Sequence, residues 1–142
     1  MQLTVSLSGL AFAVSARLVS LLNAEVLSQG KTLHDNDVIF NFRDKSYNME
    51  DGGYHPVEIR LFRHHGAWCF DYITDFCWVG GPFPELAKEI DFSFPDSSGY
   101  LLYTGYSDAA DCAELYEVWE NNFISYYWDG AFDEVEITTS GC

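Results

Sequence analysis

The chain has 142 residues, of which 48% are hydrophobic and 17% aromatic, and this composition excludes a disordered acidic tail. Seven Lys and Arg residues oppose 22 Asp and Glu residues, which gives a net charge of −15. Residues 89–142 hold twelve of the acids and no Lys, Arg or His, so the charge disfavours direct binding of nucleic acid or of an anionic membrane surface.

The first thirty residues predict a short strand followed by a helix. Residues 3–7 (LTVSL) are the strand candidate, and residues 13–29 have helical periodicity that ends at Gly30. The apolar stripe of this helix consists of Val14, Leu18, Leu21, Leu22 and Val26. The segment imitates a signal-peptidase site, but no basic residue precedes Arg17, so we expect a strand and a helix rather than a signal peptide. No apolar run approaches the roughly 20 residues that a membrane-spanning helix needs.

Three alternating segments then predict an antiparallel meander: DVIFNFRD, PVEIRLFR and WCFDYITDFCW. The tight turn RHHGAW pairs Arg63 with Trp68, and therefore Leu61 with Phe70 and Ile59 with Tyr72. Pairing Phe42 with Val57 places Phe40 opposite Ile59 and Val38 opposite Leu61, so that every apolar residue shares one face. Strict alternation places the following residues of the third segment on that face: Trp68, Phe70, Tyr72, Thr74, Phe76 and Trp78.

The second half of the chain predicts a short helix from about Pro84, two strands in DFSF and YLLYTGY, a long helix and a last strand in FDEVEITT. Ser107 is the expected N-cap of the long helix, and Gly130 ends it. Its apolar face consists of Cys112, Leu115, Tyr116, Trp119, Phe123 and Tyr127. We therefore expect one domain, 1–142, of the α+β class, in which two main helices cover the aromatic face of a mainly antiparallel sheet of five or six strands.

One end of the meander is the candidate binding site. The loop from Asp44 to His55 and the segment WVGGPFPE leave the sheet at the same end, so two Gly-Gly loops should be neighbours. A twelve-residue hairpin loop is longer than usual, and such loops are often functional. The candidate ligand- or partner-binding residues are Tyr47, Asp51, Tyr54, His55 and Trp78, with Arg43 at the floor. The alternative is a loop that packs on itself, with glycines present only for positive φ.

No motif assigns a cofactor, a metal or a catalytic residue. Neither Gly-Gly segment is a phosphate loop, and the cysteines and histidines form no zinc pattern. Asp71 and Asp75 are predicted on one strand face about 13 Å apart, too far for paired catalytic carboxylates. We expect Asp71 to pair with Arg60, and Asp75 to be solvated or to cap a loop. His55 beside Asp51 or Glu50 could act as a general base, but a packing or hydrogen-bonding role is favoured.

Two other surfaces offer alternatives to the loop end. The acidic half of the long helix is a candidate for docking a basic protein or for acting as an inhibitor that mimics phosphates, although a solvated face is the favoured explanation. Its residues are Asp111, Glu114, Glu117 and Glu120. The second surface is the mixed face of the meander, which would be covered by terminal segments or form a homodimer contact. It comprises Ile39, Phe62, Cys69 and Ile73 among Asn41, Glu58, Arg60 and Asp71.

The segments FNFRDKSYNMEDGGYHPVEIRL, YITDF, VGGPFPELAKEIDFSF and ELYEVWENNFISY resemble an uncharacterised bacterial family, the domain of unknown function 2787. The resemblance covers nearly the whole chain, apart from the apolar N-terminus and the turn HHGAWC. It implies a small cytoplasmic bacterial domain without an assigned activity, cofactor or catalytic residue. The four cysteines agree with a reducing compartment, and Cys142 shows no prenylation pattern.

The sequence thus predicts a small cytoplasmic binding protein that acts through the paired Gly-Gly loops or the acidic helix. Its partner would be a protein or a small molecule. The alternative is an enzyme that acts on a small molecule in a cleft at the same loops.

Overall fold

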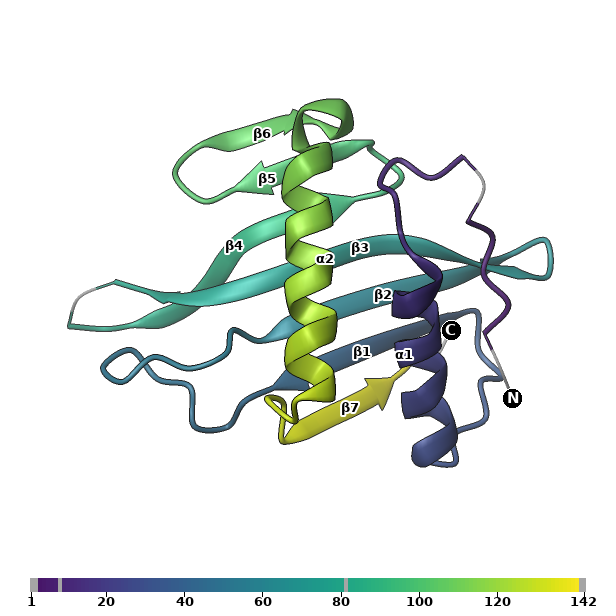
Figure 1. Ribbon diagram of the computed structural model, residues 1–142, viewed down its shortest axis with the longest axis horizontal. Coiled ribbons are helices and arrows are strands. Elements are labelled where there is room, and N and C mark those ends of the chain that lie inside the picture. The colour runs from purple at the N-terminus through teal and green to yellow at the C-terminus, as the bar shows by residue number, and fades with distance from the viewer. Residues whose placement is uncertain (1–2, 8, 81, 141–142) are drawn as a thin grey trace.

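The computed structural model describes residues 3–7, 9–80 and 82–140, which form two layers (Figure 1). The elements are α1 (Ala16–Ser28), β1 (Asp37–Arg43), β2 (Val57–His64), β3 (Ala67–Val79), β4 (Glu85–Ser93), β5 (Ser98–Leu101), β6 (Gly105–Asp108), the 3-10 helix η1 (Ala109–Cys112), α2 (Ala113–Trp128) and β7 (Glu134–Thr138). The strands form one antiparallel sheet in the order β6-β5-β4-β3-β2-β1-β7. Both α-helices lie on the same face of this sheet, as Figure 1 shows.

The predicted α+β class is confirmed, but within the described residues the sheet has seven strands rather than five or six. The added strand arises from YLLYTGY, which was predicted as one strand but holds a turn between β5 and β6. The helix predicted from Pro84 is also wrong, because residues 85–93 form β4. This segment satisfies its backbone by pairing with β3 on one side and β5 on the other. At the N-terminus, the predicted strand 3–7 is reduced to a single bridge between Val5 and Trp68.

The core lies between the sheet and the helices and is rich in aromatic rings. The predicted registers of β1 and β2 are confirmed, since Phe42 pairs with Val57, Phe40 with Ile59 and Val38 with Leu61. The α1 stripe is also confirmed, with Leu18, Leu21, Leu22 and Val26 fully buried. Burying each such side chain contributes about 1.5–3 kcal/mol, so this layer contact accounts for much of the stability.

A β-bulge in β3 reverses the faces that simple alternation predicts. The turn pairs Arg63 with Trp68 and Leu61 with Phe70, as expected, but Arg60 then pairs with Tyr72, so Asp71 is an extra residue. Beyond this bulge Ile73 faces the helices and is fully buried. The prediction that Tyr72, Thr74, Phe76 and Trp78 share the face of Trp68 and Phe70 is therefore wrong.

The long helix was predicted from Ser107, but β6 extends to Asp108 and η1 precedes the start of α2 at Ala113.

The carboxylate of Glu120, which was predicted to lie on the exposed acidic face, points into the core and is only 4% exposed. Its Oε2 accepts hydrogen bonds from the Tyr116 hydroxyl at 2.7 Å and from the Ser15 N–H at 3.1 Å. Burial and the Glu120 carboxylate raise the pKa of the Tyr116 hydroxyl above its ordinary value, so the hydroxyl remains a donor.

The other three predicted acidic residues, Asp111, Glu114 and Glu117, are exposed as expected. Among the described residues, neither helix has the length and apolar character needed to cross a lipid bilayer.

Glu120 and Glu117 provide a matched test of this correction. We expect Glu120→Ala to lower the free energy of unfolding by about 1–3 kcal/mol, because it leaves two donors at the layer contact without an acceptor. Glu117→Ala, which removes an exposed carboxylate from the same helix, should change it by less than about 0.5 kcal/mol. Urea unfolding monitored by tryptophan fluorescence measures both values, and equal effects of the two substitutions would contradict the buried role of Glu120.

Candidate functional site

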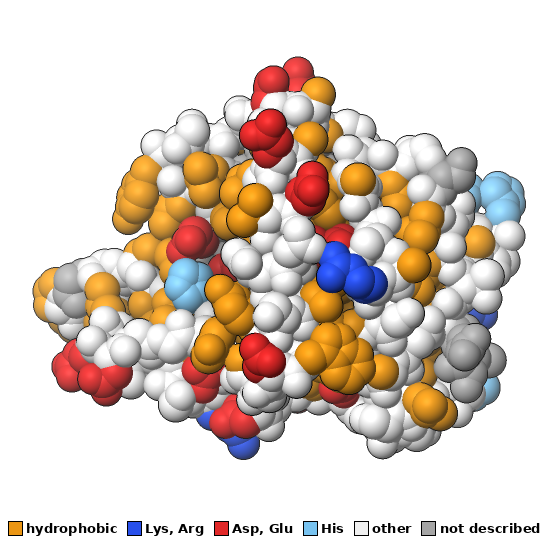
Figure 2. All heavy atoms as spheres, in the orientation of Figure 1, with side chains coloured by type: hydrophobic (Ala, Val, Ile, Leu, Met, Phe, Trp, Pro, Cys, Tyr) orange, Lys and Arg blue, Asp and Glu red, His pale blue; other side chains and the backbone are white. Residues whose placement is uncertain are grey.

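A cavity of about 330 Å³ lies between the β1–β2 loop, β3 and α2. Aromatic side chains form its walls, and a histidine and an aspartate form its floor. The residues that line the cavity include Tyr54, His55, Asp75, Trp119, Tyr126 and Phe132. Figure 2 shows a histidine and acidic side chains among hydrophobic ones on this face of the molecule. The volume is within the range of small-ligand sites, near its lower end.

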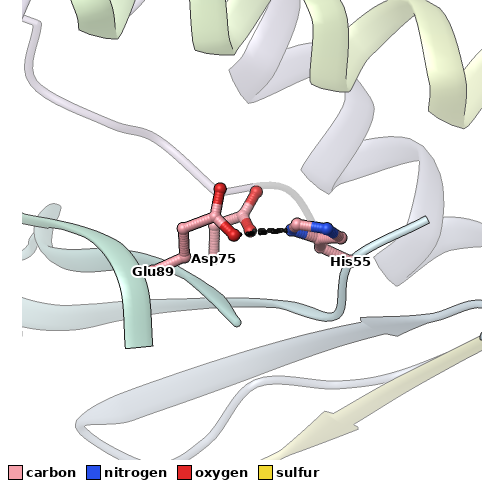
Figure 3. A group of neighbouring side chains, drawn as sticks. All are labelled: His55, Asp75 and Glu89. Atoms are coloured by element: carbon pink, nitrogen blue, oxygen red, sulfur yellow. Dashed lines mark hydrogen bonds and ion pairs between the residues drawn. The ribbon is translucent and has the colours of Figure 1, made fainter. Parts of the chain in front are cut away.

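Three titratable side chains converge at the floor, from three separate parts of the chain (Figure 3). His55 comes from the end of the β1–β2 loop, Asp75 from β3 and Glu89 from β4. The Nδ1 atom of His55 lies 3.0 Å from Oδ1 of Asp75 and 3.4 Å from Oε2 of Glu89. The three side chains are 34%, 15% and 34% exposed, respectively, so the group is partly shielded from water. His55 and Asp75 line the cavity, and Glu89 stands beside them.

Two β-bulges direct the carboxylates toward the helices. The extra residue Asp71 shifts the alternation of β3, so that Asp75 faces the helix side together with Ile73. A second bulge follows, because Asp75 pairs with Ile90 while Phe76 pairs with Lys88. Glu89 is the extra residue of β4 there, and its side chain reaches His55. A bulge redirects side chains in this way without a change of strand order.

The helix layer fixes the orientation of Asp75. The indole N–H of Trp119 on α2 donates a hydrogen bond to Oδ2 of Asp75 at 3.0 Å, which leaves Oδ1 for the imidazole. Cys77 lies two residues after Asp75 on β3, so the two side chains point to the same face of the sheet. Burial, together with a hydrogen bond to the Glu89 carboxylate, raises the pKa of the Cys77 thiol to about 11. The thiol therefore stays protonated beside Glu89 at neutral pH.

The hydrogen bond from His55 to Asp75 raises the pKa of the imidazole above its ordinary value of 6.5, and the charges of Asp75 and Glu89 act in the same direction. Burial opposes this shift but is the smaller effect. The floor therefore favours the imidazolium form. Even with His55 protonated, two carboxylates face one positive charge, so the floor keeps an excess of negative charge.

The β1–β2 loop is internally packed and holds His55 in place. The Asp44 carboxylate accepts hydrogen bonds from the Ser46 N–H and from the Tyr54 N–H, each at 3.0 Å. Gly53 has a φ of +135°, and a Cβ atom there would lie 2.9 Å from both Asp44 Oδ2 and the Tyr47 Cα, so this position requires glycine. The alternative of a self-packed loop is thus correct in its geometry, and the packed loop presents Tyr54 and His55 to the cavity.

The predicted meeting of the two loops is present, since the N–H of Trp78 donates to the Tyr47 hydroxyl at 3.1 Å. Gly81 of the second Gly-Gly pair lies outside the described residues. The predicted site residues are nevertheless divided between two hollows. Tyr54 and His55 line the cavity on the helix side, whereas Arg43, Tyr47 and Trp78 line another hollow of about 520 Å³ on the opposite face.

Arg43 therefore does not form the floor beneath His55. The side chains of β1 alternate, and Phe42 contacts Phe123 of α2 at a ring distance of 5.0 Å, so its neighbour Arg43 faces the other side. Asp51 is exposed within the loop, where Asn48 contacts its carboxylate. The ring of Tyr47 lies 5.1 Å from that of His55 and 6.5 Å from that of Trp78, so Tyr47 stands between the two hollows.

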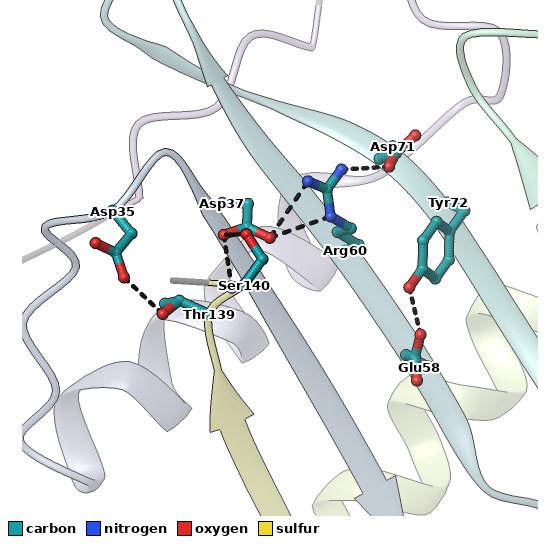
Figure 4. A network of polar contacts seen from close by, with 8 residues as sticks. All are labelled: Asp35, Asp37, Glu58, Arg60, Asp71, Tyr72, Thr139 and Ser140. Carbon is teal, nitrogen blue, oxygen red and sulfur yellow. Dashed lines mark hydrogen bonds and ion pairs between the residues drawn. The ribbon is translucent and has the colours of Figure 1, made fainter. Parts of the chain in front are cut away.

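The sheet face opposite the helices carries a polar network (Figure 4). The predicted pairing of Arg60 with Asp71 is confirmed, and Arg60 also contacts Asp37 at 3.2 Å. The Tyr72 hydroxyl donates to Glu58 beside it. Of the residues predicted for a mixed contact face, Ile73 is absent from this side because of the Asp71 bulge.

Sequence reasoning missed three residues of the floor and its support: Asp75, Glu89 and Trp119. Asp75 was expected to be solvated or to cap a loop, because strict alternation placed it with Asp71. Glu89 was expected in a helix, and Trp119 was assigned to the core without regard to its indole N–H. The one available signal was the alternation of Glu89 and Asp91 with Ile90 and Phe92, which is compatible with a strand that begins before residue 91.

Comparisons with known proteins agree with the predicted resemblance. A family model described as "Protein of unknown function (DUF2787)" matches residues 16–138. The hypothetical protein VC0508 from the VSP-II pathogenicity island of Vibrio cholerae is 35% identical, with a TM-score of 0.84 over 94% of this chain and 100% of that one. The hypothetical protein VC1805 from the island VPI-2 of the same species is 40% identical, with a TM-score of 0.80 over 92% and 98%, and is described as sharing structural homology with the human P32 protein. No curated protein matches the chain.

The raised pKa of His55 gives a prediction about pH. Because the folded state binds the imidazole proton more tightly than the unfolded state, this contribution to stability is complete below about pH 6.5 and is lost as the pH rises through the folded pKa. We expect Asp75→Asn to lower the His55 pKa, and the stability difference from the wild type to shrink as the pH rises. NMR titration of the imidazole and unfolding at several pH values test this, with Glu117→Gln as a control. An unchanged His55 titration in Asp75→Asn would contradict it.

Proposed function

Since this chain belongs to the DUF2787 family, described as proteins of unknown function, we propose that it is a binding protein that captures a positively charged group in the cavity beside α2. The observation that carries the proposal is the convergence of the Asp75 and Glu89 carboxylates on His55, where His55 and Asp75 line an aromatic-walled cavity. The excess negative charge there is complementary to an ammonium or guanidinium group.

The walls of the cavity suit such a ligand as well as its floor does. Tyr54 on the loop and Tyr126 on α2 contact each other edge to face with ring centroids 4.9 Å apart, and the Trp119 ring lies deeper beside Asp75. Cations bind favourably over the faces of aromatic rings, and the gain increases when the cation is desolvated. Rings of this kind also cover the apolar stem of a lysine or arginine side chain.

The charge of the rest of the molecule supports the same ligand class. Asp111 is exposed on η1, and Glu114 and Glu117 are exposed on α2. Helix α2 also forms a wall of the cavity. Acidic side chains are visible along this face in Figure 2. A net charge of −15 attracts cations and speeds their encounter with the protein. The acidic helix and the loop end thus serve one site, with the helix attracting the ligand and the cavity holding it.

An ammonium or guanidinium group could come from a free small molecule or from a basic partner protein. Isothermal titration calorimetry with two probes separates these sources. Agmatine presents a guanidinium on a short free chain, and a blocked five-residue peptide with one central arginine presents it from a backbone. Tighter binding of the peptide would indicate a protein partner, whereas tighter binding of agmatine would indicate a small molecule.

We expect at least one probe to bind the wild type, and Asp75→Asn to weaken its affinity at least about tenfold, which corresponds to about 1.4 kcal/mol. Glu117→Gln removes the same charge outside the cavity and should change the affinity by less than about threefold, since exposed charges are screened by solvent. Absence of binding by both probes, or equal weakening by the two substitutions, would show the proposal to be wrong.

A further inference from the structure

The Nδ1 atom of His55 lies at the spacing of ligands around one metal ion from an oxygen of each of two carboxylates. Nitrogen and oxygen ligands of Zn²⁺ lie about 2.0–2.2 Å from the metal, so at angles of about 90–109° two ligands are separated by about 2.8–3.6 Å. His55 Nδ1 lies 3.0 Å from Asp75 Oδ1 and 3.4 Å from Glu89 Oε2. All three atoms lie within 4.8 Å of one another, so rotation of the two carboxylate side chains would bring the three atoms to one ion.

The donor set distinguishes between classes of metal. Ca²⁺ and Mg²⁺ take oxygen ligands almost exclusively. One imidazole nitrogen with two carboxylate oxygens suits the divalent transition metals, such as Zn²⁺, Co²⁺, Mn²⁺ and Fe²⁺. Two carboxylates also balance the double positive charge of such an ion.

The surroundings of these atoms are those of an ordered site. Two of the three residues stand on paired strands, where the bulges at Asp71 and Glu89 direct them. The indole N–H of Trp119 holds the second oxygen of Asp75 at 3.0 Å. Hydrogen bonds of this kind to the far atom of a ligand fix its orientation and strengthen metal binding.

From this geometry we infer that His55, Asp75 and Glu89 bind one divalent transition-metal ion, with the remaining coordination position open to the aromatic cavity. Three protein ligands and one open position are typical of metal sites that bind a further ligand, whereas purely structural sites are closed by four. The inference goes beyond capture of an organic cation and is separable from it. The ion and an ammonium or guanidinium group would use the same carboxylate oxygens, so each should displace the other.

The test begins with protein dialysed against a chelator and then freed of it. Zn²⁺ and Co²⁺ are titrated at about pH 8, because metal ligands must be deprotonated. Calorimetry gives the affinity and stoichiometry, the visible absorption of Co²⁺ reports nitrogen and oxygen coordination, and NMR of the imidazole nitrogens identifies the ligand atom. We expect one ion per chain and a change in the chemical shift of His55 Nδ1.

Two variants and one control decide the ligands. His55→Gln and Glu89→Gln should each weaken Zn²⁺ binding at least about tenfold, whereas Glu117→Gln should leave it unchanged. Circular dichroism shows whether each variant is folded, and Glu89, at a bulge and 34% exposed, is the substitution that the fold should tolerate best. The inference is overturned if the folded wild type binds neither ion at a stoichiometry of one, or if the folded Glu89→Gln variant binds as tightly as the wild type.

Titration of the metal-free protein with agmatine and with the arginine peptide separates this inference from the proposed function. Metal binding without binding of agmatine or of the arginine peptide would support the metal site and refute the organic-cation proposal. Binding of either probe without metal binding would do the reverse. Binding of both, with each lowering the apparent affinity of the other, would support both and place them on the same oxygens.

Discussion

The direction of every side chain in the second half of β3 depends on one residue, Asp71, which has no partner on β2. Without this bulge, Asp75 would face the same side as Arg60, and Ile73 would leave the core. The carboxylate of Asp71 pairs with the Arg60 guanidinium on the open face, so the same residue that shifts the strand is held by a charge-assisted contact. This contact spans neighbouring strands and stabilises the shifted register on which the helix-side cavity depends.

The cavity also depends on the contact between the two layers. Trp119 packs in the core with its ring stacked on Phe123 at 5.0 Å, while its N–H reaches Asp75 in the sheet. The ring is therefore fixed by packing, and its one polar atom is fixed by the carboxylate. The β1–β2 loop contributes His55 from a third direction, and hydrogen bonds to the Asp44 carboxylate hold this loop in place. Such support from strands, helix and a packed loop is what an accurate binding geometry requires.

The sequence predicted the parts of this arrangement that follow from periodicity and hydrophobicity. Alternation in β1 and β2 gave their register, the stripe in α1 gave its buried face, and loop lengths gave the meeting of Tyr47 with Trp78. A β-bulge cannot be recognised from the alternation of apolar and polar residues, because the added residue does not change the composition of the strand. Asp75 was therefore placed on the face of the sheet opposite the helices. Glu120 was misplaced for a related reason, since a carboxylate is expected in water unless partners such as Tyr116 are known. The position of Glu89 was not predicted, because Pro84, which precedes β4, was interpreted as the start of a helix.

The strand order leaves β6 at one margin of the sheet and β7 at the other (Figure 1). The outward-facing N–H and C=O groups of an edge strand can pair with a strand from another molecule, and such pairing commonly begins aggregation. Here the two edge strands, β6 and β7, are only four and five residues long. Glu134 and Glu136 are exposed on β7, and β6 ends at Asp108. Like charges would oppose each other whenever two copies met along these margins, so the acidity of the C-terminal part also protects an open sheet from growing by addition of further chains.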